Sequence, residues 1–76
     1  MHTITEIKFR DGYNVLLTFE NGVSKTADLK PFISNGISAP LKDPDYFKLG
    51  SIEPGGGITW PNGYDFCPNY LWKISI

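Results

Sequence analysis

The sequence predicts a small α+β domain that begins with an antiparallel β-meander. The first observation behind this prediction is Asn21-Gly22, a pair typical of tight hairpin turns, which lies between two stretches rich in β-branched and apolar residues. The second is that proline-initiated helical turns and short β-type segments follow in separate blocks, an order that favours α+β over repeated β-α-β units. We therefore expect one compact domain, residues 1–76, with a three-stranded meander, short helices, a second β-hairpin and a short C-terminal helix.

The first strand is predicted over residues 3–9, where apolar and charged side chains alternate and Ile4 breaks the pattern. A loop of two residues would turn the apolar side chains of this strand away from the core. A loop of three residues, at 10–12, instead places Ile7 opposite Val15 on the core side. The sequence thus predicts an antiparallel pairing of the first two strands.

The central hairpin is predicted to turn through a two-residue type I′ loop at residues 21–22. Such a loop pairs Phe19 with Ser24 and Val15 with Asp28. The resulting second face of the sheet carries three apolar residues: Leu16, Val23 and Ala27. We expect another segment of the chain or a partner protein to cover this face, and we treat these three residues as a possible interface.

Short helices are predicted after the meander. Proline begins a helical turn at residues 30–33, and residues 37–42 are predicted to be a connector with an extended step at Ala39-Pro40. Asp43 is suited to cap a helix of about two turns, with Pro44 at its first position and Gly50 after its end. This helix is too short to be stable alone, so packing of its apolar side chains must hold it in place.

The last third of the chain is predicted to form a hairpin and a helix. Residues 51–53 and 58–60 are strand-like and flank the glycine-rich segment 54–57. A helix is predicted over residues 68–73, and residues 74–76 could either extend it or add an edge strand.

Composition limits the possible functions. The chain has 76 residues, a net charge of −1, one cysteine and one histidine. Its basic residues are scattered, which argues against direct binding of nucleic acid. A single cysteine permits no intrachain disulfide, and no apolar run reaches membrane-spanning length. We expect a cytoplasmic protein that does not associate with membranes.

The best candidate binding site lies in residues 60–65 and consists of Trp60, Asn62, Tyr64 and Asp65. An exposed tryptophan beside a rigid turn and a carboxylate could anchor a partner. In the alternative interpretation, Trp60 belongs to the core, Asn62 forms a turn with the following glycine, and Asp65 caps the last turn of structure. The sequence leaves both interpretations open.

Catalytic candidates are weak. The predicted register puts Asp28 on the core face, where burial would raise its carboxyl pKa and suit it to act as a general base. The more ordinary role for Asp28 is to cap the helical turn at residues 30–33. Cys67 precedes a predicted helix, but the single histidine, His2, is far from it in sequence and lies at the terminus. We expect no catalytic residue, no enzyme activity, no cofactor and no metal site.

Several motifs in this order resemble those of a small prokaryotic family called domain of unknown function 2442. The motifs are Phe19 with Gly22, Asp28-Leu29, Leu41 with Asp43-Pro44 and Phe47, and the stretch Trp60 to Asp65. The similarity extends from about Ile4 to Leu71. The chain departs from the family pattern at Cys67, where a small or acidic residue is expected, and at Ser24 and Thr26, where apolar residues are expected.

The resemblance implies a stand-alone cytoplasmic domain with no established activity. It also implies a partner, because genes of this family resemble members of toxin–antitoxin-like pairs. Our first hypothesis is therefore a non-catalytic protein-interaction module that binds an unidentified protein or forms a homodimer. The alternatives are a small-ligand binder or enzyme that uses Asp28 or Asp65 near Trp60, and nucleic-acid binding directly or through a partner.

Overall fold

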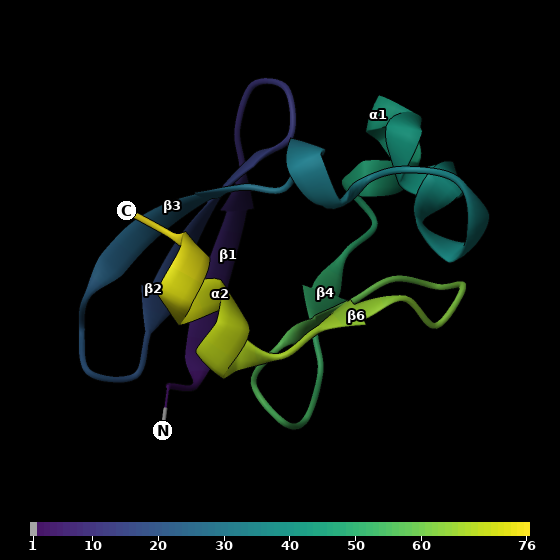
Figure 1. The fold of residues 1–76 in the computed structure, drawn as a ribbon. Helices are drawn as coiled ribbons and strands as arrows, with labels where there is room; N and C mark the ends of the chain where they lie inside the picture. Colours follow the sequence, from purple (N-terminus) through teal and green to yellow (C-terminus); the bar gives the residue numbers. More distant parts are fainter. Residues whose placement is uncertain (1) are drawn as a thin grey trace.

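The computed structural model describes residues 2–76, which form two three-stranded antiparallel sheets and several short helices (Figure 1). The first sheet has the order β1-β2-β3 and the second the order β4-β5-β6. The strands are β1 (Ile4–Phe9), β2 (Asn14–Phe19), β3 (Ser24–Asp28), β4 (Ser51–Ile52), β5 (Ile58–Thr59) and β6 (Asp65–Phe66). The helices are the 3-10 helices η1 (Lys30–Phe32) and η2 (Gly36–Lys42), and the α-helices α1 (Pro44–Phe47) and α2 (Pro68–Ile74). The predicted α+β fold class is confirmed.

The first hairpin has the predicted parity but a shifted register. Phe9 pairs with Val15 and Ile7 pairs with Leu17, so the expected pairing of Ile7 with Val15 is wrong by two residues. Because side chains alternate with a period of two, a shift by two keeps Ile7 and Phe9 on the core side. The parity argument therefore located the correct face although the turn lies later in the chain than predicted.

A bulge in β1 explains why Ile4 interrupts the sequence pattern. Ile4 pairs with Phe19, whereas Glu6 pairs with Thr18, so Thr5 and Glu6 together oppose one residue of β2. The extra residue reverses the alternation, which turns Ile4 into the core and leaves Thr5 exposed.

The register of the central hairpin differs from the predicted register by one residue. The backbone N–H of Phe19 donates to the carbonyl oxygen of Val23 (2.9 Å), which leaves a three-residue loop. Within residues 2–76 only glycines have a positive φ, and Gly22 has φ 86°. Asn21 therefore does not take the conformation that a type I′ turn needs, and its carboxamide oxygen instead accepts the Val23 N–H (3.0 Å).

Because of this change in register, each side chain of β3 lies on the opposite face of the sheet from the one predicted. Val15 pairs with Ala27, so Ala27 is buried on the core face and Asp28 is exposed on the other face. The prediction that Asp28 lies on the core face is wrong, because a one-residue slip moves every side chain of the strand to the opposite side.

The second sheet contains the predicted hairpin and one strand that the sequence did not predict. Ile52 pairs with Ile58, and Ile58 pairs in turn with Phe66 of β6. Gly57 lies so close to the carbonyl oxygen of Phe66 that a Cβ atom at this position would overlap it. Glycine is therefore required where β5 and β6 meet.

The segment between the two sheets agrees with the prediction at the cap of α1 and differs from it at residues 37–42. The Asp43 carboxylate accepts the Asp45 N–H (2.9 Å), which confirms the predicted cap of α1. The predicted connector with an extended step at Ala39-Pro40 is wrong, because the chain forms η2 there. The buried Ser38 hydroxyl accepts the Ser34 N–H (2.9 Å), which stabilises this compact turn and lets η2 reach the core.

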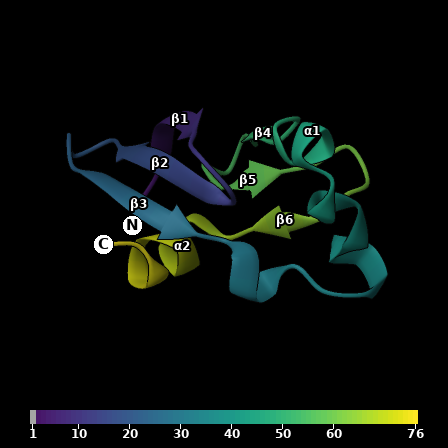
Figure 2. The ribbon, with the colours of Figure 1, turned by 90° about the horizontal axis from the view of Figure 1, so that it is seen from above.

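The core lies between the inner face of the first sheet, the second sheet and the helices (Figure 2). Helix α2, confirmed near its predicted position, packs beside β3, and the second sheet continues next to the first. The Ile4 N–H donates to the Gly56 carbonyl oxygen (3.1 Å) and so connects the two sheets. The buried apolar residues are Ile4, Val15, Leu17, Phe19, Ala27, Leu29, Leu41, Phe47, Ile58, Trp60, Phe66 and Leu71.

Candidate functional site

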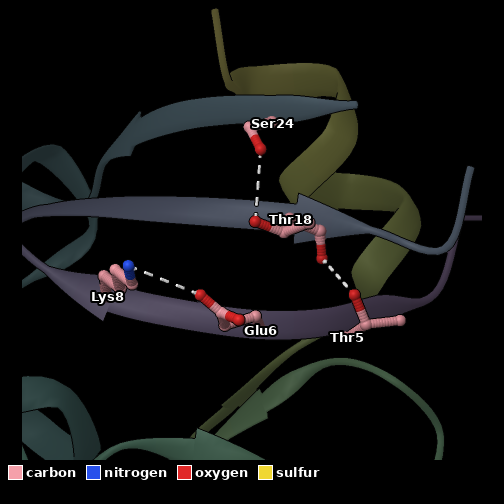
Figure 3. Close-up of polar contacts among 5 residues, drawn as sticks. All are labelled: Thr5, Glu6, Lys8, Thr18 and Ser24. Atoms are coloured by element: carbon pink, nitrogen blue, oxygen red, sulfur yellow. Dashed lines mark hydrogen bonds and ion pairs between the residues drawn. The ribbon is translucent and has the colours of Figure 1, made fainter. Parts of the chain in front are cut away.

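The outer face of the first sheet, which we call the open face, is turned away from α2 (Figure 3). Each strand contributes alternate side chains to this face, whereas the others point into the core. The open face consists of Thr5, Glu6, Lys8, Asn14, Leu16, Thr18, Ser24, Thr26 and Asp28. All of these side chains are exposed or half-buried.

The centre of the open face is uncharged. Two cross-strand pairs form it, Leu16 with Thr26 and Thr18 with Ser24. The hydroxyls of Thr18 and Ser24 lie 3.2 Å apart and share a hydrogen bond, and the Thr5 hydroxyl donates to the Thr18 carbonyl oxygen (3.2 Å) (Figure 3). These contacts link all three strands through short side chains of limited flexibility.

Charged groups occupy the rim of the open face. Lys8 Nζ lies 3.7 Å from Glu6 Oε1, and the two side chains are 61% and 59% exposed. Such an exposed pair contributes little to stability because water screens it. Asp28, on the opposite edge strand, accepts the N–H of Lys30, the first residue of η1 (3.0 Å), although the N-cap position of η1 is Leu29.

The open face presents hydroxyl groups, one leucine and a charged rim. Among residues 2–76 the structure contains no pocket and no group of three or more histidine, cysteine or acidic side chains placed to hold a metal ion. Within the same residues, no helix is long and apolar enough to cross a membrane.

The three residues predicted as an interface do not share a face. Leu16 lies on the open face, Ala27 is buried in the core, and Val23, 40% exposed, lies where β3 begins beside the turn. The prediction that they form one apolar patch is wrong because it depended on the two-residue turn. The corrected register leaves Leu16 as the apolar member of the open face.

Trp60 is a core residue, as one of the two sequence interpretations held. Its side chain is 2% exposed, and its indole Nε1–H donates to the Phe47 carbonyl oxygen (2.8 Å). The ring packs against Phe47 and Phe66. Trp60 therefore presents no surface to a partner, and its contribution is to stability.

Asn62 organises the turn between β5 and β6 and ties it to the helices. Its carboxamide oxygen accepts the Tyr64 N–H (3.1 Å), and its Nδ2 donates to the Ile37 carbonyl oxygen (2.7 Å). Its backbone N–H donates to the Tyr46 hydroxyl (2.9 Å). Every polar group of the Asn62 side chain is thus used in structure.

Tyr64 and Asp65 take different positions around β6. The Tyr64 hydroxyl donates to the Phe32 carbonyl oxygen (3.3 Å), and burial, together with the nearby Asp65 and Tyr70, raises the Tyr64 pKa. Asp65 is exposed and pairs with Thr59 in the strand instead of capping a helical turn. The four predicted site residues are neighbours in the fold, but Trp60 lies beneath the surface on which Asp65 is exposed.

A cluster around Trp72 was not predicted from the sequence. The His2 ring stacks on the Trp72 ring with centroids 4.0 Å apart, and Lys25 Nζ lies 4.1 Å from the centroid of the Trp72 ring. Lys25 Nζ also donates to the Trp72 carbonyl oxygen (2.7 Å), and Phe19 packs edge-on against the ring. The cluster fastens α2 to β2, to β3 and to the segment that precedes β1. Nothing in the local sequence around His2 indicated this contact, because it joins the two ends of the chain.

Cys67, the other reactive residue considered from the sequence, is exposed at the start of α2, and its side chain makes no capping hydrogen bond. The open face itself did have a signal in the sequence. Ser24 and Thr26 stand where the family pattern led us to expect apolar residues. The corrected register places both on the open face, where hydroxyl side chains fit.

Comparison with known protein families gives one match. The family described as "Protein of unknown function (DUF2442)" matches residues 4–76. The chain belongs to this family. A search of curated proteins and a search of solved structures each found no match to this DUF2442 chain.

Proposed function

We propose that this DUF2442 domain is a non-catalytic protein-interaction module and that the open face is its contact surface. The observation that carries the proposal is the distribution of charge on this face. Leu16 and Thr18 of β2, with Ser24 and Thr26 of β3, form an uncharged area, whereas Glu6 and Lys8 lie on β1 and Asp28 lies at the end of β3.

This distribution has the form of a protein interface. The centres of protein–protein interfaces are depleted in charged residues and their rims are polar. One face of an antiparallel sheet commonly meets water, and long charged side chains are well suited to such a face. Here the middle strand contributes Asn14, Leu16 and Thr18, none of which is charged. A partner that covered the centre would not have to desolvate a charge.

The size of the face determines what kind of complex to expect. Three strands at about 4.8 Å spacing and five residues at about 3.3 Å per residue span roughly 200 Å² in plan. A stable interface buries about 800 Å² on each partner. The open face therefore supports a transient contact, or forms one part of a larger interface that continues beyond its edges.

The family resemblance supports a second small protein as the partner. Because its members resemble components of toxin–antitoxin-like pairs, the partner would be encoded beside this chain and would carry the biochemical activity. The DUF2442 domain would then act by covering or positioning that partner.

The test is capture of partners by the tagged chain at native expression, read by mass spectrometry, for the wild type and two leucine variants. Leu16→Arg places a charge in the centre of the open face. Leu49→Arg is the matched control, because Leu49 is exposed but lies outside the open face. We expect one stoichiometric small partner with the wild type and with Leu49→Arg, and its loss with Leu16→Arg while the circular dichroism spectrum is unchanged. Equal capture by both variants, or no specific partner at all, contradicts the proposal.

A further inference from the structure

The outer edge of β3 carries backbone groups directed away from the sheet. In β3, alternate residues face β2, as the hydrogen bonds that Val23 and Leu29 make to β2 and the adjoining turn show. Thr26 has the opposite parity, so its N–H and C=O point outward. Both outward groups are already bonded to another extended residue: the Thr26 N–H donates to the Ile76 carbonyl oxygen and the Ile76 N–H donates to the Thr26 carbonyl oxygen, each at 2.9 Å.

The exchange of both hydrogen bonds is the pattern of a hydrogen-bonded antiparallel pair. The edge of β3 therefore accepts an extended strand in antiparallel orientation, with its register centred on Thr26. Ser24 and Asp28 share the parity of Thr26, so their backbone groups also point outward. Ile76 pairs with Thr26 alone and holds its place through backbone contacts, because its side chain is 95% exposed.

β3 lacks two of the features that usually prevent edge pairing, proline and a bulge. Proteins protect edge strands with proline, bulges or charged side chains that point inward. Residues 24–28 contain no proline, and their pairing with β2 runs without a register shift. The charged Lys25 is drawn to α2 by its hydrogen bond to the Trp72 carbonyl oxygen. Within the described part of the chain, this edge is therefore protected by the inward-pointing Lys25 and by the pairing of Ile76 with Thr26.

We propose that the β3 edge pairs with β3 of a second copy of this chain, around a two-fold axis at Thr26, after Ile76 has left the edge. This inference rests on the proposed interaction function and names a partner for the same sheet. In this register Thr26 pairs with its own counterpart, and Ser24 of each copy pairs with Asp28 of the other. Each outward-facing residue, 24, 26 and 28, then has a partner, so the edge is self-complementary as a two-fold interface requires.

The side chains of the edge fit this arrangement as well. Ser24 and Asp28 both project from the open face, so pairing brings the Ser24 hydroxyl of one copy beside the Asp28 carboxylate of the other. A hydroxyl donating to a carboxylate is a charge-assisted hydrogen bond, stronger than one between neutral groups. The two-fold axis stands perpendicular to the sheet, so the open faces of both copies join into one continuous six-stranded surface. This surface has twice the area of the single face, roughly 400 Å² in plan, which is still below the area of about 800 Å² that a stable interface buries on each partner.

Ile76 sets the balance between the free and the paired chain. A second β3 must take the Thr26 hydrogen bonds that Ile76 holds, so Ile76 competes with dimerisation. Removal of Ile76 frees two hydrogen bonds at the edge, and we expect it to strengthen dimerisation roughly tenfold or more.

The experiment measures molecular mass by analytical ultracentrifugation over a range of protein concentrations. Four proteins are compared: the wild type, the variant lacking Ile76, and that deletion combined with either Thr26→Pro or Thr26→Val. Proline removes the outward N–H of Thr26 without removing a hydrogen bond to β2, and proline is tolerated at such edge positions. Valine is the matched control, because it keeps the N–H and has a similar shape. Circular dichroism shows whether each variant is folded.

We expect the variant lacking Ile76 to dimerise at lower concentration than the wild type. The same deletion combined with Thr26→Val should dimerise as the deletion alone does, whereas the folded deletion combined with Thr26→Pro should remain monomeric. A variant lacking Ile76 that stays monomeric at all concentrations overturns the inference, whatever the proline variant does. A dimer that survives in a folded proline variant also overturns it, because a different surface must then form the contact. Leu16 lies on the middle strand away from this edge, so the capture experiment tests a different surface. If Leu16→Arg loses the captured partner while the variant lacking Ile76 forms no dimer, the inference is overturned and the proposed function stands. A dimer of the variant lacking Ile76, with no partner captured by the tagged wild type, supports the inference and contradicts the proposed function.

Discussion

The two sheets of this domain are held together in different ways. The first has strands of five or six residues and long backbone ladders, whereas each strand of the second has two residues. The second sheet depends instead on side chains, such as the Trp60 indole that donates to Phe47 and the Asn62 carboxamide that donates to Ile37. The first sheet therefore leaves one face free for contacts, whereas the second contributes Ile58 and Phe66 to the core.

The two tryptophans provide the strongest test of this comparison. Trp60 is buried in the second sheet, whereas Trp72 of α2 is half-buried against the first. We expect Trp60→Ala to lower the free energy of unfolding by about 3–5 kcal/mol, which removes most of the stability of a small domain. Trp72→Ala should cost clearly less. Urea denaturation followed by circular dichroism measures both, and a larger loss for Trp72→Ala would contradict the comparison.

Two glycines beside β5 give a smaller and more local effect. A Cβ atom at Gly57 would overlap the Phe66 carbonyl oxygen, whereas a Cβ atom at Gly55 meets open space. We expect Gly57→Ala to destabilise the domain by about 1–3 kcal/mol because β5 and β6 must move apart. Gly55→Ala should stay within about 0.5 kcal/mol of the wild type. Thermal unfolding of both variants checks this, and equal midpoints would show that the close approach of the strands is not needed.

The hairpin turns are expected to behave alike although the sheets differ. Gly22, in the first sheet, has φ 86°, and Gly63, in the second, has φ 89°; both have open space around them. Alanine at either position must adopt a left-handed conformation, at a cost of about 1–2 kcal/mol. Chemical denaturation should give similar losses for Gly22→Ala and Gly63→Ala. A loss limited to one of them would mean that the other loop rearranges.

The effect of pH through Tyr64 should be the smallest. Burial and the nearby Asp65 raise the Tyr64 pKa in the folded chain, so the folded state holds its phenolic proton to higher pH than the unfolded state does. Its contribution is complete below the ordinary tyrosine pKa of about 10 and is lost as the pH rises through the higher folded value. Unfolding measured across this alkaline range should show a steeper loss of stability for the wild type than for Tyr64→Phe. Parallel curves would show that Tyr64 ionises as freely in the folded chain as in the unfolded one.

Sequence reasoning identified the type of most elements but misjudged their register. The cap at Asp43 and the helix at Pro68 were predicted because capping depends on residues that are close in the chain. The turn at Asn21 was placed correctly, yet its loop has three residues instead of two. This single error moved Ala27 and Asp28 to the wrong faces, and with them the predicted interface.

The candidate site could be predicted only in part. Leu16 was correctly placed on an outer face, but its companions Val23 and Ala27 were not. The hydrogen bond between the hydroxyls of Thr18 and Ser24 on the open face was not predicted, because it depends on the true pairing of β2 and β3. Residues 74–76 were predicted either to extend the last helix or to add an edge strand. In the structure Ile74 is the last residue of α2, whereas Ile76 exchanges two backbone hydrogen bonds with Thr26.

The amino-acid sequence by itself determined the α+β class, the order of the strands and helices other than β6 and η2, the approximate positions of the turns, and the cap at Asp43, because these depend on local conformational preferences and on the spacing of apolar residues. Only the tertiary structure decided the register of the hairpins, the burial of Trp60 and the open face. Register depends on which of several similar loops lets the apolar side chains pack best, and this is a property of the whole core. The contact between His2 and Trp72, from opposite ends of the chain, exists because the folded core brings β1 and α2 together.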